Sequence, residues 1–345
     1  AGEVRWEILL ESYLIPAAVY GYISVVEPFP QTDRQKGEIS YLGMFADCLV
    51  PFFILLLIVQ AMVGYVELGT DSWITKITGS ILNDPQKGTL LFIYTSGLMF
   101  ALRFFAGPIV HRISSLGLLF VSALIGCLGL YLIGSVEGVV MMVLAVTVYG
   151  IGKTFLWPTM LGVVGEQFPK SATVAMALLG CAGMTSAGLL GGPGIGYKQD
   201  RFASEELQEL SDTTFNRYRA DGEQRFLFFE AIRGLDGRKV GVVTDVDDQG
   251  QPEPGASLVK DKEIAIEQGE WDGEKFTQLR TLDQWWEDNK QYADEDRPRV
   301  AEAGLVGSRT AIKVTALVPA AMAVCYLLMI LGFRMKGGYR HVPHD

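Results

Sequence analysis

The sequence predicts an all-α polytopic membrane protein with a small soluble domain inserted before its last membrane helix. Hydrophobic residues make up 49% of the 345 residues, and the mean hydropathy of +0.26 is high for a water-soluble protein. The apolar residues gather in runs of about 20, the length that a helix needs to cross a hydrocarbon core of about 30 Å. The charged residues gather elsewhere. Residues 197–307 hold 15 basic and 26 acidic side chains, a net charge of −11, against −10 for the whole chain.

The apolar runs predict about seven crossings of the membrane. The first candidate, Trp6–Val26, is the weakest. No basic segment precedes it and no small-residue cleavage site follows it, so we do not interpret it as a signal peptide. Because Ala1 leads almost directly into this run, we expect the chain to be a fragment of a longer membrane protein. The six clearer runs are Cys48–Leu68, Leu90–Pro108, Leu116–Gly134, Val139–Leu156, Ala172–Gly196 and Thr310–Phe333.

The distribution of lysine and arginine predicts the orientation. With the first run ending in the cytoplasm, the short cytoplasmic segments carry seven Lys or Arg residues and the opposite segments carry five. An acidic insert would also be repelled by an anionic cytoplasmic leaflet, so we place it on the periplasmic or extracellular side of the cell (inner) membrane. The predicted parts are a membrane helix at 1–27, a central cytoplasmic loop at 28–47, five membrane helices at 48–196, the acidic insert at 197–308, the last membrane helix at 309–334 and a cytoplasmic tail at 335–345.

The sequence of the insert predicts a small α+β domain. Glu205–Tyr218 and Leu279–Tyr292 have helical spacing, whereas Arg225–Ile232 and Lys239–Val246 have the pattern of two strands around a turn. A stretch from Asp245 opens like a calcium loop, but its twelfth position lacks the required glutamate, so we expect no metal site. No motif for nucleophilic or histidine catalysis occurs, and we expect neither enzymatic activity nor a cofactor.

Four charged residues, Glu67, Asp71, Arg103 and Lys153, stand within or at the ends of apolar runs. A charge at mid-membrane costs about 3 kcal/mol on insertion scales and generally faces a cavity or a partner. We therefore expect Lys153 to meet a carboxylate or an anionic substrate group, with Glu67 as the candidate partner. The alternatives are that Glu67 and Asp71 mark the outer helix end, and that Lys153 extends to the cytoplasmic surface.

Two short motifs add a resemblance to a known family. Gly107-Pro-x-x-His111-Arg112 begins at the end of the second of the six clearer runs, and Glu166-Gln-Phe-Pro follows the fourth. In this helix order the chain resembles the C-terminal half of a major facilitator superfamily transporter, preceded by its sixth helix. The resemblance implies that Arg103, Gly107, His111, Arg112 and Glu166 form gating loops, although His111 replaces the usual acidic residue.

The resemblance implies secondary transport by alternating access. The segment from Glu67 to Trp73 is similar to the seventh helix of sugar and nucleoside permeases, so the expected solute is sugar-like or nucleoside-like, with or without proton coupling. The expected partners are this solute, the bilayer and the N-terminal half of the same transporter, and no nucleic acid. The alternative is a non-transporting sensor or anchor that presents an acidic binding domain. Besides the four charged residues, the candidate cavity residues are Gln60, Tyr65, Trp73, Tyr94, Tyr149 and Trp157.

Overall fold

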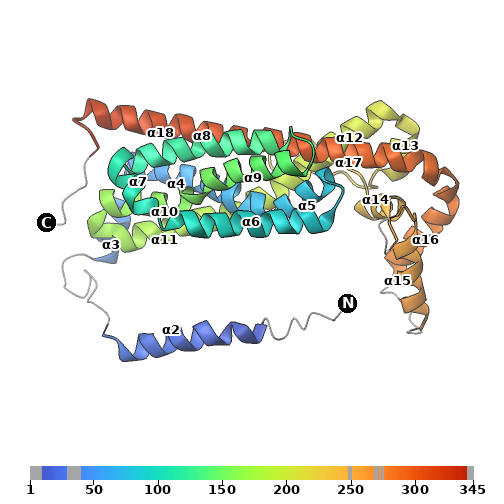
Figure 1. The fold of residues 1–345 in the computed structure, drawn as a ribbon, viewed down its shortest axis with the longest axis horizontal. Coiled ribbons are helices and arrows are strands. Elements are labelled where there is room, and N and C mark those ends of the chain that lie inside the picture. Colours follow the sequence, from blue (N-terminus) through green and yellow to red (C-terminus); the bar gives the residue numbers. More distant parts are fainter. Residues whose placement is uncertain are drawn as a thin grey trace.

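The described residues form a long helical bundle with a smaller helical part at one end (Figure 1). The computed structural model describes residues 10–28, 40–247, 251–267, 271, 273 and 276–339. Within these ranges no residue belongs to a strand, and only three isolated β-bridges occur. The all-α prediction for the membrane part is therefore confirmed.

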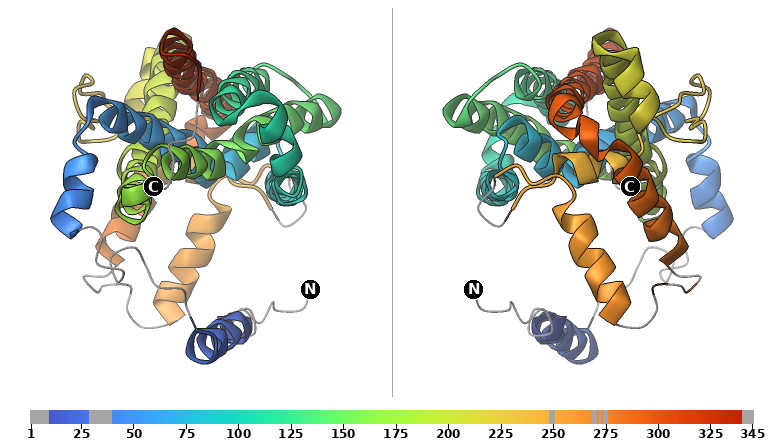
Figure 2. Two further views of the ribbon diagram at one scale, coloured as in Figure 1. Left: turned by 90° about the vertical axis from the view of Figure 1, so that its left-hand side faces the viewer. Right: turned by 90° about the vertical axis from the view of Figure 1, so that its right-hand side faces the viewer.

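Five helical stretches of the described residues are long and apolar enough to cross a membrane, as in a multi-pass membrane protein. The sequence predicted about seven. The segment Leu10–Val26 is apolar but shorter, and α6 (Pro85–Arg103) begins with polar residues and is not among the five. In Figure 2 the helix α2 (Leu14–Val26) stands apart from the bundle, and it buries no residue. The five stretches are Pro51–Ile81, Ser115–Ile133, Val139–Gln167, Pro169–Leu210 and Thr277–Met335.

The bundle helices pack side by side around one apolar core. The helix α8 packs against α9 and α18, α4 packs against α11, and α5 packs against α6. The short helix α3 (Tyr41–Asp47) lies at one end. The bundle elements are α4 (Pro51–Gly64), η1 (Tyr65–Gly69), α5 (Thr70–Ile81), α6, α7 (Ala106–Ile113), α8 (Ser115–Ile133), α9 (Val139–Thr154), α10 (Leu156–Gln167), η2 (Pro169–Ser171), α11 (Ala172–Ser186), η3 (Ala187–Gly191), α12 (Gly192–Leu210), α17 (Ala293–Thr315) and α18 (Leu317–Met335).

Most of the long helices are interrupted part-way along their length. The segments η1 and η3 are single π-helical turns, whereas short breaks separate α6 from α7, α9 from α10, and α17 from α18. In four cases a proline stands in the first turn of the following helix, where its missing N–H needs no helical partner. Residues 107–112, which the sequence predicted to be a loop, are helical and belong to α7. These four prolines are Pro108, Pro158, Pro193 and Pro319.

Glycines let two interrupted helices cross closely. A β-carbon on Gly64 would lie 2.0 Å from the carbonyl oxygen of Gly183, and one on Gly69 would lie 2.6 Å from the α-carbon of Gly191. Only residues without a side chain allow backbones to approach this far. The two π-turns η1 and η3 therefore lie against each other in the middle of the bundle.

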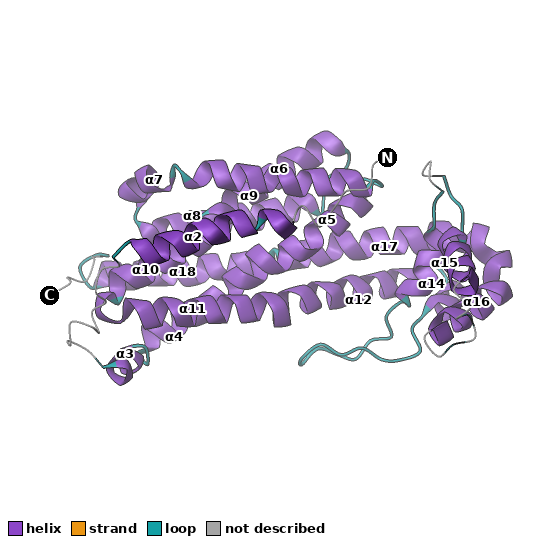
Figure 3. Ribbon diagram, turned by 90° about the horizontal axis from the view of Figure 1, so that it is seen from below, coloured by secondary structure: helices purple, strands orange, loops and turns teal. Residues whose placement is uncertain are grey.

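The smaller helical part is a continuation of two bundle helices. The helices α12 and α17 run on side by side past the bundle and carry the remaining elements (Figures 1 and 3). The predicted limits of the insert, 197 and 308, thus fall inside these helices. A second apolar core includes Leu207, Trp286 and Val300. The additional elements are α13 (Asp212–Tyr218), α14 (Gly237–Thr244), α15 (Ala256–Glu267), α16 (Thr277–Asn289) and η5 (Lys290–Tyr292).

The α+β prediction for the insert is wrong. The predicted strand Lys239–Val246 is largely the helix α14, because Asp236 caps its first turn by accepting the N–H of Arg238 at 2.9 Å. Val242 and Val243 then face the second core. The other predicted strand, Arg225–Ile232, forms the tip and one arm of a hairpin that contains only isolated bridges.

Replacing Gly64 by alanine should destabilise the bundle by at least about 2 kcal/mol, because the added methyl group overlaps the Gly183 backbone. The matched control is Gly188→Ala in η3, where nothing lies within 4 Å of the added carbon. The free energy of unfolding of this control should equal that of the parent or exceed it by up to about 1 kcal/mol, because alanine favours a helix more than glycine does. Denaturant unfolding in detergent measures both. Equal effects of the two substitutions would refute the close crossing.

Candidate functional site

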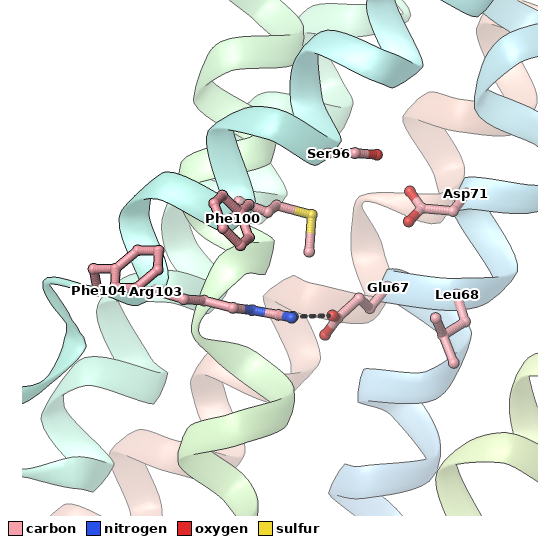
Figure 4. A pocket seen from close by; sticks show the side chains of 8 residues that line it. Glu67, Leu68, Asp71, Ser96, Phe100, Arg103 and Phe104 are labelled. Atoms are coloured by element: carbon pink, nitrogen blue, oxygen red, sulfur yellow. Dashed lines mark hydrogen bonds and ion pairs between the residues drawn. The ribbon is translucent and has the colours of Figure 1, made fainter. Parts of the chain in front are cut away.

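An open cleft of about 550 Å³ lies between η1–α5 and α6. Figure 4 shows two carboxylates from the first helix facing the arginine and the aromatic rings of the second. The cleft combines charged groups with a polar hydroxyl and apolar surfaces, as ligand sites do. Its lining residues are Glu67, Leu68, Asp71, Ser96, Met99, Phe100, Arg103 and Phe104.

The first ion pair in the cleft joins Arg103 to Glu67. Nη2 of the Arg103 guanidinium lies 3.3 Å from Oε1 of Glu67. The Glu67 side chain is 5% exposed and the Arg103 side chain 48%. The second carboxylate oxygen of Glu67 is buried without a hydrogen-bond partner. The glutamate is thus held inside the bundle by a partner that itself reaches the open cleft.

The second ion pair joins Lys153 of α9 to Asp71 of α5 in direct contact. The Lys153 side chain is 1% exposed, so it does not extend to the surface, and its ammonium lies 5.1 Å from the centre of the Tyr149 ring. The predicted pairing of Lys153 with Glu67 is wrong. Arg103, at the end of α6, forms the ion pair with Glu67. Lys153 pairs with Asp71 instead.

Two predicted cavity aromatics instead support the π-turns. A π-turn leaves a backbone carbonyl without its usual helical donor, and a buried carbonyl needs another. The Tyr149 hydroxyl donates to the carbonyl of Val66 in η1 at 2.6 Å, and Nε1 of Trp73 donates to the carbonyl of Gly192, directly after η3, at 2.9 Å. Tyr149 is 1% exposed. In this conformation both side chains hold the bundle backbone.

The other predicted cavity residues lie in separate places. Gln60 is buried with no hydrogen-bond partner for either side-chain polar atom, and it lies beside Gly183, as Trp157 does. Tyr94 is exposed on α6, and its hydroxyl lies 2.9 Å from Oγ1 of Thr147. Tyr65 belongs to η1.

The predicted gating residues divide into two groups. Arg103 pairs with Glu67 in the cleft, whereas Glu166 accepts a hydrogen bond from Ser115 at 2.7 Å and another from Tyr339. Glu166 therefore ties the end of α10 to α8 and to the segment after α18. Arg112 is exposed on α7, which also contains Gly107 and His111; the His111 side chain lies outside the described part.

Sequence reasoning missed Lys198. This half-buried lysine donates to Oγ1 of Thr315 at 2.7 Å and lies 5.2 Å from the centre of the Tyr65 ring. It escaped notice because the acidic insert was expected to begin at residue 197. The cleft residues Ser96, Met99, Phe100 and Phe104 were also missed, although the two phenylalanines flank Arg103 in the sequence.

No protein-family model, curated protein or solved structure gives a significant match to this chain. The described residues include no group of three or more His, Cys, Asp or Glu side chains that could hold a metal ion. The chemistry of the site therefore rests on its two ion pairs and on the cleft that Glu67, Asp71 and Arg103 line.

Removing one partner of the buried pair Lys153–Asp71 should lower the free energy of unfolding more than removing both partners. We expect Asp71→Asn to destabilise the protein by about 3 kcal/mol, because the Lys153 ammonium is left buried without a counter-charge. The double variant Asp71→Asn/Lys153→Met should recover most of that loss. Denaturant unfolding in detergent measures the cycle.

The matched control is the surface pair of Arg309 and Glu137, in which the Glu137 side chain is 79% exposed. Glu137→Gln should cost less than about 1 kcal/mol. A double variant at Asp71 and Lys153 that is as unstable as the two single losses combined would show that the charges are not coupled.

Proposed function

We propose that this protein is a secondary active transporter that moves a small polar solute across a membrane by alternating access. The observation that carries the proposal is the set of two ion pairs, Arg103–Glu67 across an open cleft and Lys153–Asp71 behind it, which together link three helices. Charges within membrane helices are costly and mark solute or ion pathways. Ion pairs between different helices can also separate and re-form when those helices move.

The lining of the cleft supports a hydroxyl-rich solute such as a sugar or a nucleoside. Carboxylates, a guanidinium and the Ser96 hydroxyl supply hydrogen-bonding groups, and Phe100 and Phe104 supply flat apolar faces. Sugar rings and bases present both polar edges and apolar faces to such sites. The cleft is also open, which a site for exchange with solution requires.

The helix order supports the half-transporter interpretation. Six helical stretches, several of them interrupted, follow one another from Pro51 to Met335, and glycine-lined crossings and π-turns meet near the charged layer. Interrupted helices at mid-membrane are typical of transporter binding sites. We propose that an N-terminal half covers the cleft, that the bundle lies in the cell (inner) membrane, and that the acidic part lies on its outer side.

Glu67 is the proposed proton-coupling group. One of its carboxylate oxygens has no hydrogen-bond partner, and its Arg103 partner is half-exposed in the cleft. Movement of α6 would therefore free a buried carboxylate to take up a proton. The pair Lys153–Asp71 lies deeper and would hold α5 to α9 throughout.

A sensor is the second candidate, because the acidic part is built on α12 and α17, which continue directly into the bundle. Binding to that part would be transmitted to the membrane helices through them. Transport separates the two candidates, since a sensor or an anchor would move no solute.

Glu67→Gln should abolish proton-driven accumulation while leaving exchange or downhill flux, because the amide cannot carry the proton. Lys153→Ala should impair both, because Asp71 loses its partner. The measurement is uptake of labelled sugars and nucleosides by vesicles that contain the full-length protein, with and without a proton gradient. Glu137→Gln, on the surface, is the control and should transport normally. Undiminished accumulation by Glu67→Gln would exclude Glu67 as the coupling group.

Cysteines at two exposed positions test the orientation. Glu263→Cys in α15 should react with a membrane-impermeant thiol reagent in intact cells, whereas Lys336→Cys, after α18, should react only after the membrane is opened. The opposite pattern would place the acidic part in the cytoplasm.

A further inference from the structure

A long hairpin between α13 and α14 runs back toward the bundle. In Figure 3 it lies alongside α12, on the side away from α6. Its arms are joined by the bridges Arg219–Leu235 and Gln224–Ile232, the latter with hydrogen bonds of 2.8 and 2.9 Å. Because both arms are paired, the hairpin holds a definite direction.

The hairpin tip, Phe226–Leu–Phe–Phe229, is anchored at the outer end of a predicted membrane run. The Phe226 ring lies against Gly194, where a β-carbon would come within 3.1 Å of it. The Tyr197 ring centre lies 6.0 Å from that of Phe226, and the Tyr197 hydroxyl donates to the Glu230 carbonyl at 2.7 Å. The tip thus reaches the level at which the apolar run 172–196 ends.

The tip is apolar and exposed. Phe228 is 81% exposed, Leu227 56% and Phe229 40%. Charged side chains border the tip: Arg225 and Glu230 stand directly before and after it and are exposed. On the arms, Arg233 and Glu223 lie 3.6 Å apart. An apolar cluster that is open on one side and bordered by charges marks an interaction surface.

The tip is a tight turn of the backbone. The Phe229 N–H donates to the Phe226 carbonyl at 3.0 Å, which satisfies one pair of the backbone groups of the turn. Leu227 has a φ of 53°, a conformation that favours glycine and is rare for a bulky side chain. The chain keeps an apolar residue at a position where glycine would be less strained, so the side chain itself has a use there.

We propose that the hairpin tip inserts into the outer leaflet of the bilayer and contacts its acyl chains. The tip lies against Tyr197 of α12, and the Trp73 ring packs against the preceding residue, Gly196. Aromatic residues gather at this depth in membrane proteins. The charged arms above it then meet the lipid headgroups. The side chains exposed at the tip itself, Leu227, Phe228 and Phe229, are all apolar, which favours lipid. The inference is independent of the transported solute.

A nitroxide spin label at the tip tests this placement. The background is the full-length protein with Cys48, Cys127, Cys181 and Cys325 replaced by alanine, reconstituted in phospholipid vesicles. Phe228→Cys carries the label. We compare its collision rates with oxygen, which concentrates in the bilayer, and with a water-soluble nickel chelate.

Two matched positions calibrate the measurement. Leu128, on α8, is 52% exposed, and a label on Leu128→Cys gives the value for a position in lipid. A label on Glu263→Cys gives the value for a position in water. The oxygen-to-nickel collision ratio at position 228 should approach that at 128 and exceed that at 263 several-fold. Leu227→Cys should behave in the same way, which guards against a fold defect in one variant. A ratio equal to that at 263 would place the tip in water. Low collision rates with both reagents would show a covering polypeptide. Either result overturns the proposal.

Discussion

The burial of the Lys153 ammonium is the constraint on which the rest of the bundle depends. Its side chain is 1% exposed within an apolar core, and a charge in such a place needs a counter-charge. Asp71 supplies it, and this fixes α5 against α9. Tyr149, one turn away, holds the neighbouring π-turn through the Val66 carbonyl. The buried ion pair and the π-turn η1 are therefore held in place by neighbouring side chains of the same helix, α9.

The irregular backbone needs the glycines. The π-turns η1 and η3 can meet only because Gly69 and Gly191 lack side chains, and Gly64 and Gly183 allow the same approach below them. Close crossing brings Glu67 and Asp71 to the cleft at a point where the helix is already distorted. Distorted helices deform more readily than regular ones, so the site combines costly charges with the segments best able to move.

The sequence predicted features that depend on a single residue, such as the burial of a charged side chain. It did not predict which of two neighbouring carboxylates pairs with that charge. An uninterrupted apolar run around Lys153 was enough to predict a buried cation that needs a carboxylate. The choice between Glu67 and Asp71 was not predictable, because it depends on where α6 ends and places Arg103. Likewise, the pattern of Lys239–Val246 suited a strand, but the cap at Asp236 and the second core select a helix. The predicted limits of the insert, 197 and 308, fall inside α12 and α17 because these helices change from apolar to charged surfaces without ending.

The most direct test of the proposed transport mechanism is the accessibility of Ser96, which lines the cleft on α6. In the cysteine-free full-length protein, Ser96→Cys is exposed to a charged thiol reagent from the outside of vesicles and, separately, from the inside. Alternating access predicts reaction from both sides, and slower reaction when a transported solute is present. Reaction from one side alone, or no reaction from either, would contradict the account.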